Sequence, residues 1–272
     1  MEKITSRSNP KVKAARQLRS RQGRQKSDLF LIEGITHVGA ALEAAAQRPA
    51  APQLHSLFYA PELLTSDFAL SLAAQAEQRG LAVYPVSAEV MDSLADKDNP
   101  QGLVAVARRS ELALADFSSA ELPWLAALVE PQDPGNLGTI LRTLDAVGAS
   151  GLLTLGDSVD PYHPSAVRAS LGALFWLPVI PASFEDFAAW TRGQGYTIYG
   201  TSAHAGRDFT ETKTYARPRI LLMGSERAGL SAEQAAVCDA YLRLPMRGRT
   251  TSLNLAVATG IFLYDMLAKE QG

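Results

Sequence analysis

The sequence is poor in the residues from which cross-links and metal sites are built. Of its 272 residues only Cys238 is a cysteine, so a disulfide within the chain is impossible and cysteine-rich zinc sites are excluded. The four histidines show no metal-ligand spacing, and no metal site is predicted. A chain without disulfides suits a reducing compartment, and the expected location is cytoplasmic.

Long apolar runs are also missing. No stretch approaches the ~18 apolar residues of a membrane-spanning helix, so no membrane segment is predicted. The basic N-terminus is not followed by an apolar segment, which argues against a secretory signal. With 47% hydrophobic residues, the composition is that of a globular protein able to build a core.

Three familiar loop signatures are absent as well. No G-x-G-x-x-G loop follows an early strand, and the nearest match, Gly193-Gln194-Gly195, precedes its strand. Neither a Walker loop nor a G-x-S-x-G elbow occurs. The sequence therefore does not support a conventional dinucleotide site.

What the sequence does contain is a strong charge asymmetry. Residues 1–26 hold nine Lys or Arg and one acidic residue, a net charge of +8, whereas the rest of the chain carries −10. An acidic body with a basic arm suggests a polyanionic partner. The alternative is a solvated basic helix without a partner.

The basic arm is predicted to contain a short helix followed by a tail. Ser8 or Asn9 before Pro10 is typical of a helix start. The basic residues spread around most of this helix and its tail, so the segment could follow a phosphate backbone. The arm contains no aromatic residue, so it is not expected to stack on bases.

Apolar runs alternate with helical patterns along the chain, which predicts an α/β fold. Residues 1–107 are expected to form a small α/β domain, residues 108–122 a linker, and residues 123–272 a second α/β domain. The expected strands are 29–32, 57–59, 81–84, 103–107, 125–129, 151–155, 176–180, 196–199, 219–223 and 242–244. The expected helices are 35–47, 67–79, 88–94, 137–147, 164–175, 184–192, 231–238 and one at the C-terminus.

The first of three polar loops follows the expected strand 125–129. Asn136 is predicted to cap a helix whose apolar face leaves Arg142 outside the core. An arginine there can make forked hydrogen bonds to a phosphate or carboxylate. Open α/β sheets bind ligands at strand ends, which is where Asn136 lies. The alternative is a helix cap beside a surface arginine.

The second loop follows the apolar strand 219–223. Gly224 allows the backbone to approach a ligand closely, and Glu226 stands beside Arg227 at the strand end. The alternative is a strand-to-helix turn with a solvated glutamate.

The third loop, at residues 244–252, combines a proline and a glycine with two arginines and a run of hydroxyl side chains. Thr251 or Ser252 is expected to cap the helix that follows, and Ser252 and Asn254 present polar groups near its start. The alternative is a capped core helix. One stripe of this helix is formed by Leu253, Val257, Gly260, Tyr264 and Leu267.

Together the three loops resemble the SpoU (TrmH-type) branch of the SPOUT RNA methyltransferases over roughly residues 123–268. The motif N-x-G-x-x-x-R is met by Asn136, Gly138 and Arg142. The motif G-x-E-x-x-G is met by Gly224, Glu226 and Gly229. The motif P-M-x-G-x-x-x-S-L-N is met by Pro245, Met246, Gly248, Ser252, Leu253 and Asn254. The N-terminal half resembles the L30e-like substrate-binding domain often attached to these enzymes.

The resemblance implies that the cofactor is S-adenosylmethionine and that the product is a 2′-O-methylated ribose in RNA. It also implies a deep trefoil knot in the C-terminal half and a homodimer whose catalytic pocket is completed across the interface. The type of N-terminal domain favours 23S rRNA over tRNA. The cofactor would be held largely by backbone groups around Leu222, Gly224, Leu244, Met246 and Leu253.

The resemblance also suggests roles for single residues. Arg142 would lower the cost of the developing alkoxide. The groups that fix the geometry by hydrogen bonds would be Asn136, Glu226, Ser252 and Asn254. The groups that hold RNA phosphates would be Lys11, Lys13, Arg16 and Arg168. Relatives often carry glycine where this chain has Arg227, a departure that could alter the loop or an RNA contact.

Other functions stay open at this stage. A tRNA 2′-O-methyltransferase would carry the same loops. An RNA-binding ribosome-assembly factor with a vestigial cofactor pocket is a further alternative, although the complete polar set in all three loops argues against it. A small-molecule α/β enzyme is disfavoured by the basic arm.

Overall fold

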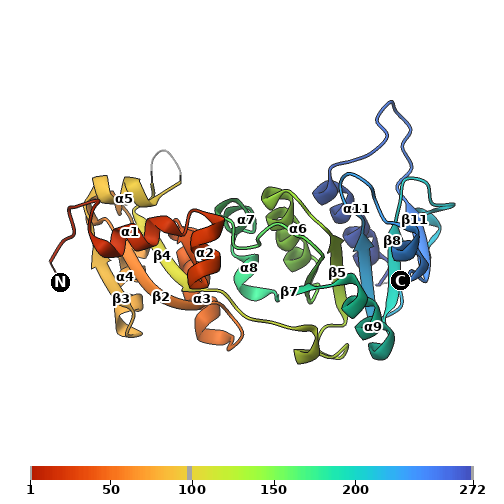
Figure 1. Ribbon diagram of the computed structural model, residues 1–272, viewed down its shortest axis with the longest axis horizontal. Helices are drawn as coiled ribbons and strands as arrows, with labels where there is room; N and C mark the ends of the chain where they lie inside the picture. Colours follow the sequence, from red (N-terminus) through yellow and green to blue (C-terminus); the bar gives the residue numbers. More distant parts are fainter. Residues whose placement is uncertain (1, 97–99, 271–272) are drawn as a thin grey trace. The chain divides into compact units, whose positions relative to one another are not determined.

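The computed structural model describes residues 2–96 and 100–270, and these residues form two compact units. Unit 1 comprises the chain up to Glu111 together with Asp160–Trp176, and unit 2 comprises Leu112–Val159 and the residues from Leu177 onward. Figure 1 labels many of the elements of both units. The boundary at Glu111 lies in the predicted linker, whereas Asp160–Trp176 belongs to the second domain in sequence but groups with the N-terminal unit.

Unit 1 is built on a four-stranded mixed sheet in the order β1-β4-β2-β3. Strands β1 and β2 run antiparallel to β4, and β3 runs parallel to β2 at the edge. The core on one face joins side chains of α1 and α5 to Phe58 and Val104 of the sheet. The strands are β1 Leu29–Glu33, β2 Gln53–Tyr59, β3 Ala82–Pro85 and β4 Leu103–Arg108. The helices are α1 Pro10–Gln17, α2 Arg21–Ser27, α3 Ile35–Gln47, η1 Pro61–Leu63, α4 Asp67–Gln78, α5 Ala88–Leu94, α7 Pro164–Ala169 and α8 Ala173–Trp176.

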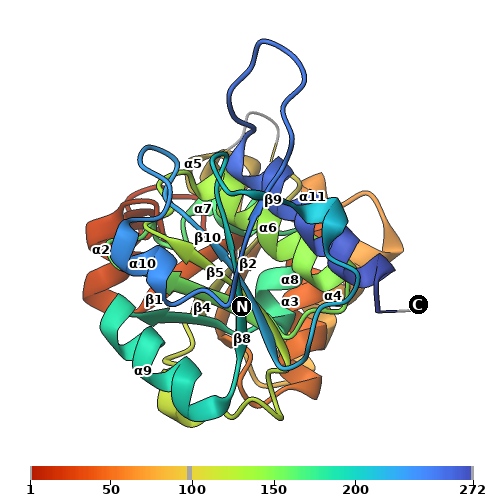
Figure 2. The ribbon, with the colours of Figure 1, turned by 90° about the vertical axis from the view of Figure 1, so that its right-hand side faces the viewer.

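Unit 2 is built on a seven-stranded parallel sheet in the order β7-β6-β5-β10-β8-β11-β9. Helix α9 lies on one side of this sheet, and α6 and α11 pack together on the other (Figure 2). The strands are β5 Trp124–Val129, β6 Gly151–Leu155, β7 Val179–Ala182, β8 Thr197–Thr201, β9 Arg207–Asp208, β10 Arg219–Met223 and β11 Ala240–Arg243. The helices are η2 Leu114–Asp116, α6 Pro134–Ala146, α9 Phe184–Gln194, η3 Phe209–Glu211, α10 Ala232–Ala236 and α11 Leu255–Ala268.

The parallel sheet explains why the strands of unit 2 read as continuous apolar runs. Every residue of β5, β6 and β10 is buried, because helices cover both faces of a parallel sheet. The strand order reverses between β5 and β10, and ligands of open α/β sheets bind at such a switch point, outside the carboxyl ends of the strands. The predicted α/β class is confirmed, and the trefoil knot stays a prediction.

Two predicted elements are wrong around residue 171. The expected helix 164–175 is broken into α7 and α8, because Leu171 and Gly172 have φ angles of 48° and 97°, outside the helical region. Trp176 consequently ends α8, and the strand expected at 176–180 begins only at Val179.

Both predicted helix caps beside the polar loops are also wrong. Helix α6 begins at Pro134, and the Asp133 side chain accepts the hydrogen bond from the Asn136 backbone N–H at 2.7 Å. Proline favours the first helical position, so the helix starts before Asn136 and leaves the Asn136 side chain free for other contacts. Helix α11 is capped by Asn254 rather than by Thr251 or Ser252.

The predicted stripe of α11 is a real face, but it is the exposed one. Val257 and Tyr264 are 52% and 53% exposed. The buried residues of the helix are Leu255, Ala256, Thr259, Phe262, Leu263 and Met266. The core-helix alternative is therefore correct only for the opposite side of α11.

The expected linker contributes to a core: Leu114 and Leu122 are buried against the strands of unit 2. Among the described residues, no helix has both the length and the apolar character to cross a membrane. The same residues include no cluster of three or more His, Cys, Asp or Glu that could hold a metal ion.

Candidate active site

The polar loops of unit 2 meet at the carboxyl ends of its parallel strands. One loop leaves β5, the second leaves β10, and the third joins β11 to α11. Because these strands are parallel, their carboxyl ends lie at the same edge of the sheet. The fold thus brings together segments separated by up to 118 residues in the chain.

A chain of side-chain hydrogen bonds joins the three loops. The Asn136 Nδ2 group donates to Glu226 Oε1 at 2.5 Å. The Asn254 Nδ2 group donates to Asn136 Oδ1 at 2.9 Å. Asn136 therefore uses both ends of its amide, the NH₂ group as donor toward one neighbouring loop and the oxygen as acceptor toward the other.

Backbone groups fix the two ends of this chain. The second carboxylate oxygen of Glu226 accepts from the Gln132 backbone N–H at 3.2 Å. Asn254 Oδ1 caps α11 by accepting from the N–H groups of Ala256 at 2.9 Å and Val257 at 3.3 Å. Each residue of the chain therefore has hydrogen-bond partners on both sides.

The two glycines of the β10 loop are needed for different physical reasons. A Cβ atom on Gly224 would lie 2.2 Å from the carbonyl carbon of Gly229, so no other residue fits there without moving the loop. Gly229 has a φ of 68°, which favours glycine. Ser225 and Gly229 close the loop with paired backbone hydrogen bonds of 3.1 and 2.9 Å. The loop is a tight turn with Glu226 and Arg227 at its exposed tip.

A cavity of about 700 Å³ lies beside these loops. Its walls include four of the five predicted cofactor-binding residues, namely Gly224, Leu244, Met246 and Leu253. Glu226, Ser252 and Asn254 also line it. Leu222 does not, because its side chain is fully buried in β10. The volume is that of a small-molecule site, which typically has ~300–1,000 Å³.

Sequence reasoning missed the wall contributed by β8. Thr201, Ser202 and His204 line the cavity where this strand ends. The Thr201 hydroxyl donates to the Leu222 carbonyl oxygen at 3.4 Å. These polar residues lie at the carboxyl end of β8 and just after it, and the rule that ligands bind at strand ends would have found them.

Comparison with known proteins gives a consistent result. The model of the SpoU rRNA Methylase family matches residues 123–264, and that of the MRM3-like substrate binding domain matches residues 9–105. The chain belongs to the SpoU rRNA methylase family.

Relatives and solved structures extend over the whole chain. It is 29% identical over 266 residues to the 23S rRNA (guanosine(2553)-2′-O)-methyltransferase RlmP of Bacillus subtilis, covering 98% of this chain and 99% of the relative. It is 31% identical over 271 residues to the 23S rRNA (uridine(2479)-2′-O)-methyltransferase of Streptomyces viridochromogenes, covering 97% and 91%. The crystal structure of an AdoMet-bound rRNA methyltransferase from Sinorhizobium meliloti matches with a TM-score of 0.87 and 36% identity, covering 97% of each chain.

Arg142, the arginine of the first SpoU motif, does not line the cavity. It is exposed on α6, and among the described residues its guanidinium has no hydrogen-bond or ion-pair partner. The side chain is thus available to a group that comes from outside this copy of unit 2.

The predicted phosphate-binding residues lie in unit 1 and fall into two kinds. Lys11, Lys13 and Arg16 are exposed on α1. Arg168 instead makes ion pairs with Asp96 at 2.9 Å and Glu33 at 3.9 Å, and its side chain is only 22% exposed. Arg168 as a phosphate ligand stays a prediction, and its charge already has carboxylate partners.

Proposed function

We propose that this protein transfers a methyl group from S-adenosylmethionine to a ribose 2′-hydroxyl of 23S rRNA. The observation that carries the proposal is the hydrogen-bonded chain Glu226–Asn136–Asn254, whose two end residues line the 700 Å³ cavity while Asn136 joins them from outside its lining. It joins one residue from each SpoU motif. Relatives named as 23S rRNA 2′-O-methyltransferases and a neighbour solved with AdoMet support the reaction, the substrate and the cofactor.

The cavity fits this cofactor in size and chemistry. Side chains of Leu242, Leu244 and Phe262 give it apolar walls, and the loops at 224–229 and 251–254 add backbone and hydroxyl groups. Such a mixture suits a ligand with a flat heterocycle, a ribose and an amino acid tail. When bound, S-adenosylmethionine supplies a methyl group attached to a sulfonium sulfur. The neutral thioether is a good leaving group when that methyl group is transferred.

The protein then has to position the ribose hydroxyl and favour its deprotonation. A 2′-hydroxyl is a poor nucleophile, and negative charge develops on its oxygen as the proton leaves. The Arg142 guanidinium stabilises that charge, and an RNA phosphate receives the proton. The rigid Asn136–Asn254 pair keeps the loops in the geometry that the reaction needs.

Dimerisation is part of the proposal. Four large apolar side chains are exposed at the start and along one side of α11, namely Leu253, Val257, Ile261 and Tyr264. A second copy of the chain covers this face and contributes its own Arg142 to complete the pocket. This accounts for the position of Arg142 outside the cavity of its own copy.

Val257→Asp is expected to give monomers in analytical ultracentrifugation and no methyl transfer in activity assays. A monomeric wild-type protein with full turnover would contradict this part.

The reaction is tested with tritiated methyl donor and unmodified transcripts of 23S rRNA and tRNA. We expect label in 23S rRNA, recovered as a 2′-O-methylated nucleoside after digestion. Label in tRNA alone would show that the enzyme is a tRNA 2′-O-methyltransferase. Label on a base would refute ribose methylation. Binding of RNA and cofactor without incorporation would favour the assembly factor. The proposed substrate agrees with the cytoplasmic location expected from the sequence.

A further inference from the structure

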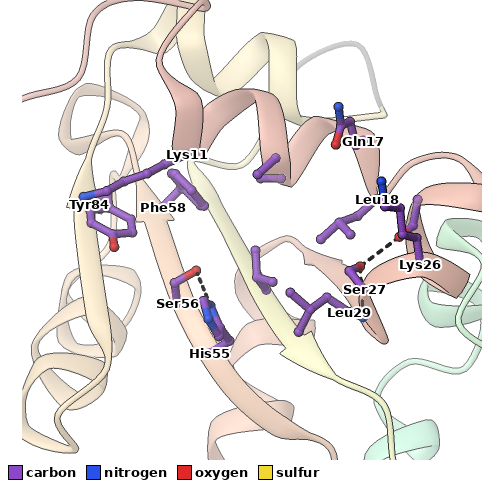
Figure 3. A pocket seen from close by; sticks show the side chains of 14 residues that line it. Lys11, Gln17, Leu18, Lys26, Ser27, Leu29, His55, Ser56, Phe58 and Tyr84 are labelled. Atoms are coloured by element: carbon purple, nitrogen blue, oxygen red, sulfur yellow. Dashed lines mark hydrogen bonds between the residues drawn. The ribbon is translucent and has the colours of Figure 1, made fainter.

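Unit 1 contains a cavity of about 400 Å³ beneath the basic helix α1. Residues of α1, α2 and of strands β1 to β4 line it, and Figure 3 shows their side chains. We call this cavity the aromatic pocket, because Phe58 and Tyr84 form one of its walls. It belongs entirely to unit 1 and shares no residue with the cavity at the SpoU motifs.

The aromatic wall is preformed. The rings of Phe58 and Tyr84 pack with centroids 5.3 Å apart at an angle of 43°. Leu18 and Val106 are buried beside them, and Ala14 and Ala15 of α1 complete an apolar lining. These apolar side chains form a surface against which a flat ring system can pack.

Two lysines stand at the rim. The Lys11 Nζ atom lies 4.0 Å from the centroid of the Tyr84 ring, a cation–π contact that holds the ammonium near the wall. Lys26 lies at the other end of the pocket in Figure 3. None of the lining residues, all within the described part of the chain, is acidic. The rim is therefore complementary to anions on either side of an apolar guest.

A β-bulge adds hydrogen-bonding groups to the pocket. The register between β2 and β4 shifts between Leu54 and Ser56, so His55 is the extra residue of a bulge. In a regular strand His55 and Ser56 would face opposite sides of the sheet. The bulge lets both line the pocket, as Figure 3 shows. The His55 Nδ1 and Ser56 Oγ atoms bond to each other at 3.4 Å, which leaves the second imidazole nitrogen for the edge of a nucleobase.

We propose that the aromatic pocket binds one unstacked nucleotide of the RNA substrate, with the base inside and the neighbouring phosphates on Lys11 and Lys26. The proposal rests on the proposed function for the identity of the RNA. A free nucleotide has the same chemistry. The RNA chain is favoured because Lys13 and Arg16, exposed on α1 but outside the pocket, extend the positive surface to further phosphates.

The proposal is tested by filling the pocket without changing its charge. Ala14→Trp places an indole among the lining residues, and Ala45→Trp makes the same change at an exposed alanine of α3 as a matched control. His55→Ala is a second variant, since His55 is exposed and its removal leaves the core intact. The probes are octauridylate, octaadenylate and an abasic ribose octamer of equal charge, with uridine and adenosine monophosphate as free nucleotides.

Base stacking should make the octanucleotides bind the wild type about tenfold or more tightly than the abasic octamer. We expect Ala14→Trp to abolish this preference and His55→Ala to reduce it, whereas Ala45→Trp retains it. Equal binding of both kinds of octamer by the wild type, or a preference unchanged in Ala14→Trp, overturns the proposal. Tight binding of a monophosphate that the octanucleotides fail to displace overturns it in favour of a free-nucleotide site.

Methyl transfer is measured separately on the same samples. A wild-type enzyme that methylates 23S rRNA but shows no base preference refutes the aromatic pocket and leaves the proposed function standing. A base preference without methyl transfer refutes the proposed function and supports the pocket as an RNA-binding site.

Discussion

In unit 2 the candidate active site is held by amide and carboxylate side chains that bond to one another, whereas the aromatic pocket of unit 1 is held by apolar packing with cations at its rim. In the Glu226–Asn136–Asn254 chain, hydrogen bonds fix the orientation of each side chain, because such bonds depend on direction. The Phe58–Tyr84 wall fixes only a shape. A reaction needs oriented groups, and recognition of a flat base needs a surface, so the two constructions suit different tasks.

The largest expected effect tests whether methyl transfer in unit 2 depends on the charge of Arg142. Arg142→Ala should lower methyl transfer to 23S rRNA by about 100-fold or more, because the developing alkoxide loses its stabilising charge. Folding and S-adenosylmethionine binding should stay near normal, since Arg142 is exposed and lies outside the cavity. Arg192→Ala, at an exposed arginine of α9, is the matched control. Full turnover by the Arg142 variant would rule out this role.

The second prediction tests how rigidly the loop of unit 2 is built. Gly224→Ala should weaken S-adenosylmethionine binding by about tenfold or more, because the new Cβ would lie 2.2 Å from Gly229 and the turn must open. Gly193→Ala is the control, since a Cβ there has no atom within 4 Å. Calorimetric titration with the cofactor measures both. Equal affinities would mean that the backbone of this loop does not hold the cofactor.

Much of the fold was readable from the sequence where apolar runs were strong. Helices 35–47 and 88–94 and strands 151–155 and 219–223 have the predicted bounds. The break after residue 169 was missed, because two adjacent residues with positive φ leave no pattern when only one of them is glycine. Sheet order could not be predicted, since it depends on contacts between segments far apart in the chain.

The two sites also differ in how much of each could be predicted from the sequence. The three loops of unit 2 could be singled out from the sequence because their residues occur in compact motifs, whereas their mutual hydrogen bonds were not foreseen and the roles of the residues stay predictions. The aromatic pocket left no such signal. Lys11, Phe58 and Tyr84 come from three distant elements, and the role of His55 depends on a bulge that the strand pattern does not reveal.

A smaller effect should appear in unit 1 at acidic pH. Burial acts to raise the pKa of Asp96, but hydrogen bonds from Arg19 and Arg168 outweigh it, and the pKa lies below its ordinary value. A lowered folded pKa contributes stability above the unfolded value of about 3.9, and this is lost as the pH falls through the folded pKa.

Asp96→Asn should therefore be less stable than the wild type near neutral pH, and the difference should shrink as the pH falls below about 4. Urea unfolding followed by circular dichroism at several pH values measures it. Glu77→Gln is the control, because Glu77 is exposed and has no ion-pair partner among the described residues. A difference that is constant with pH would show that the Arg19 and Arg168 contacts do not depend on the charge of Asp96.

The smallest effect is expected at Arg227, where the resemblance to the SpoU motif led us to expect a glycine. Arg227 lies at the exposed tip of the β10 loop and lines the cavity, whereas the tightness of the turn comes from Gly224 and Gly229. Arg227→Gly should thus change S-adenosylmethionine affinity by no more than about twofold, and RNA affinity should fall modestly with a slightly shallower salt dependence. Arg227→Lys keeps the charge and should restore RNA binding if charge alone matters. A large loss of cofactor affinity in the glycine variant would instead make Arg227 part of the cofactor site. The shape of the loop would then depend on Arg227 as well as on Gly224 and Gly229.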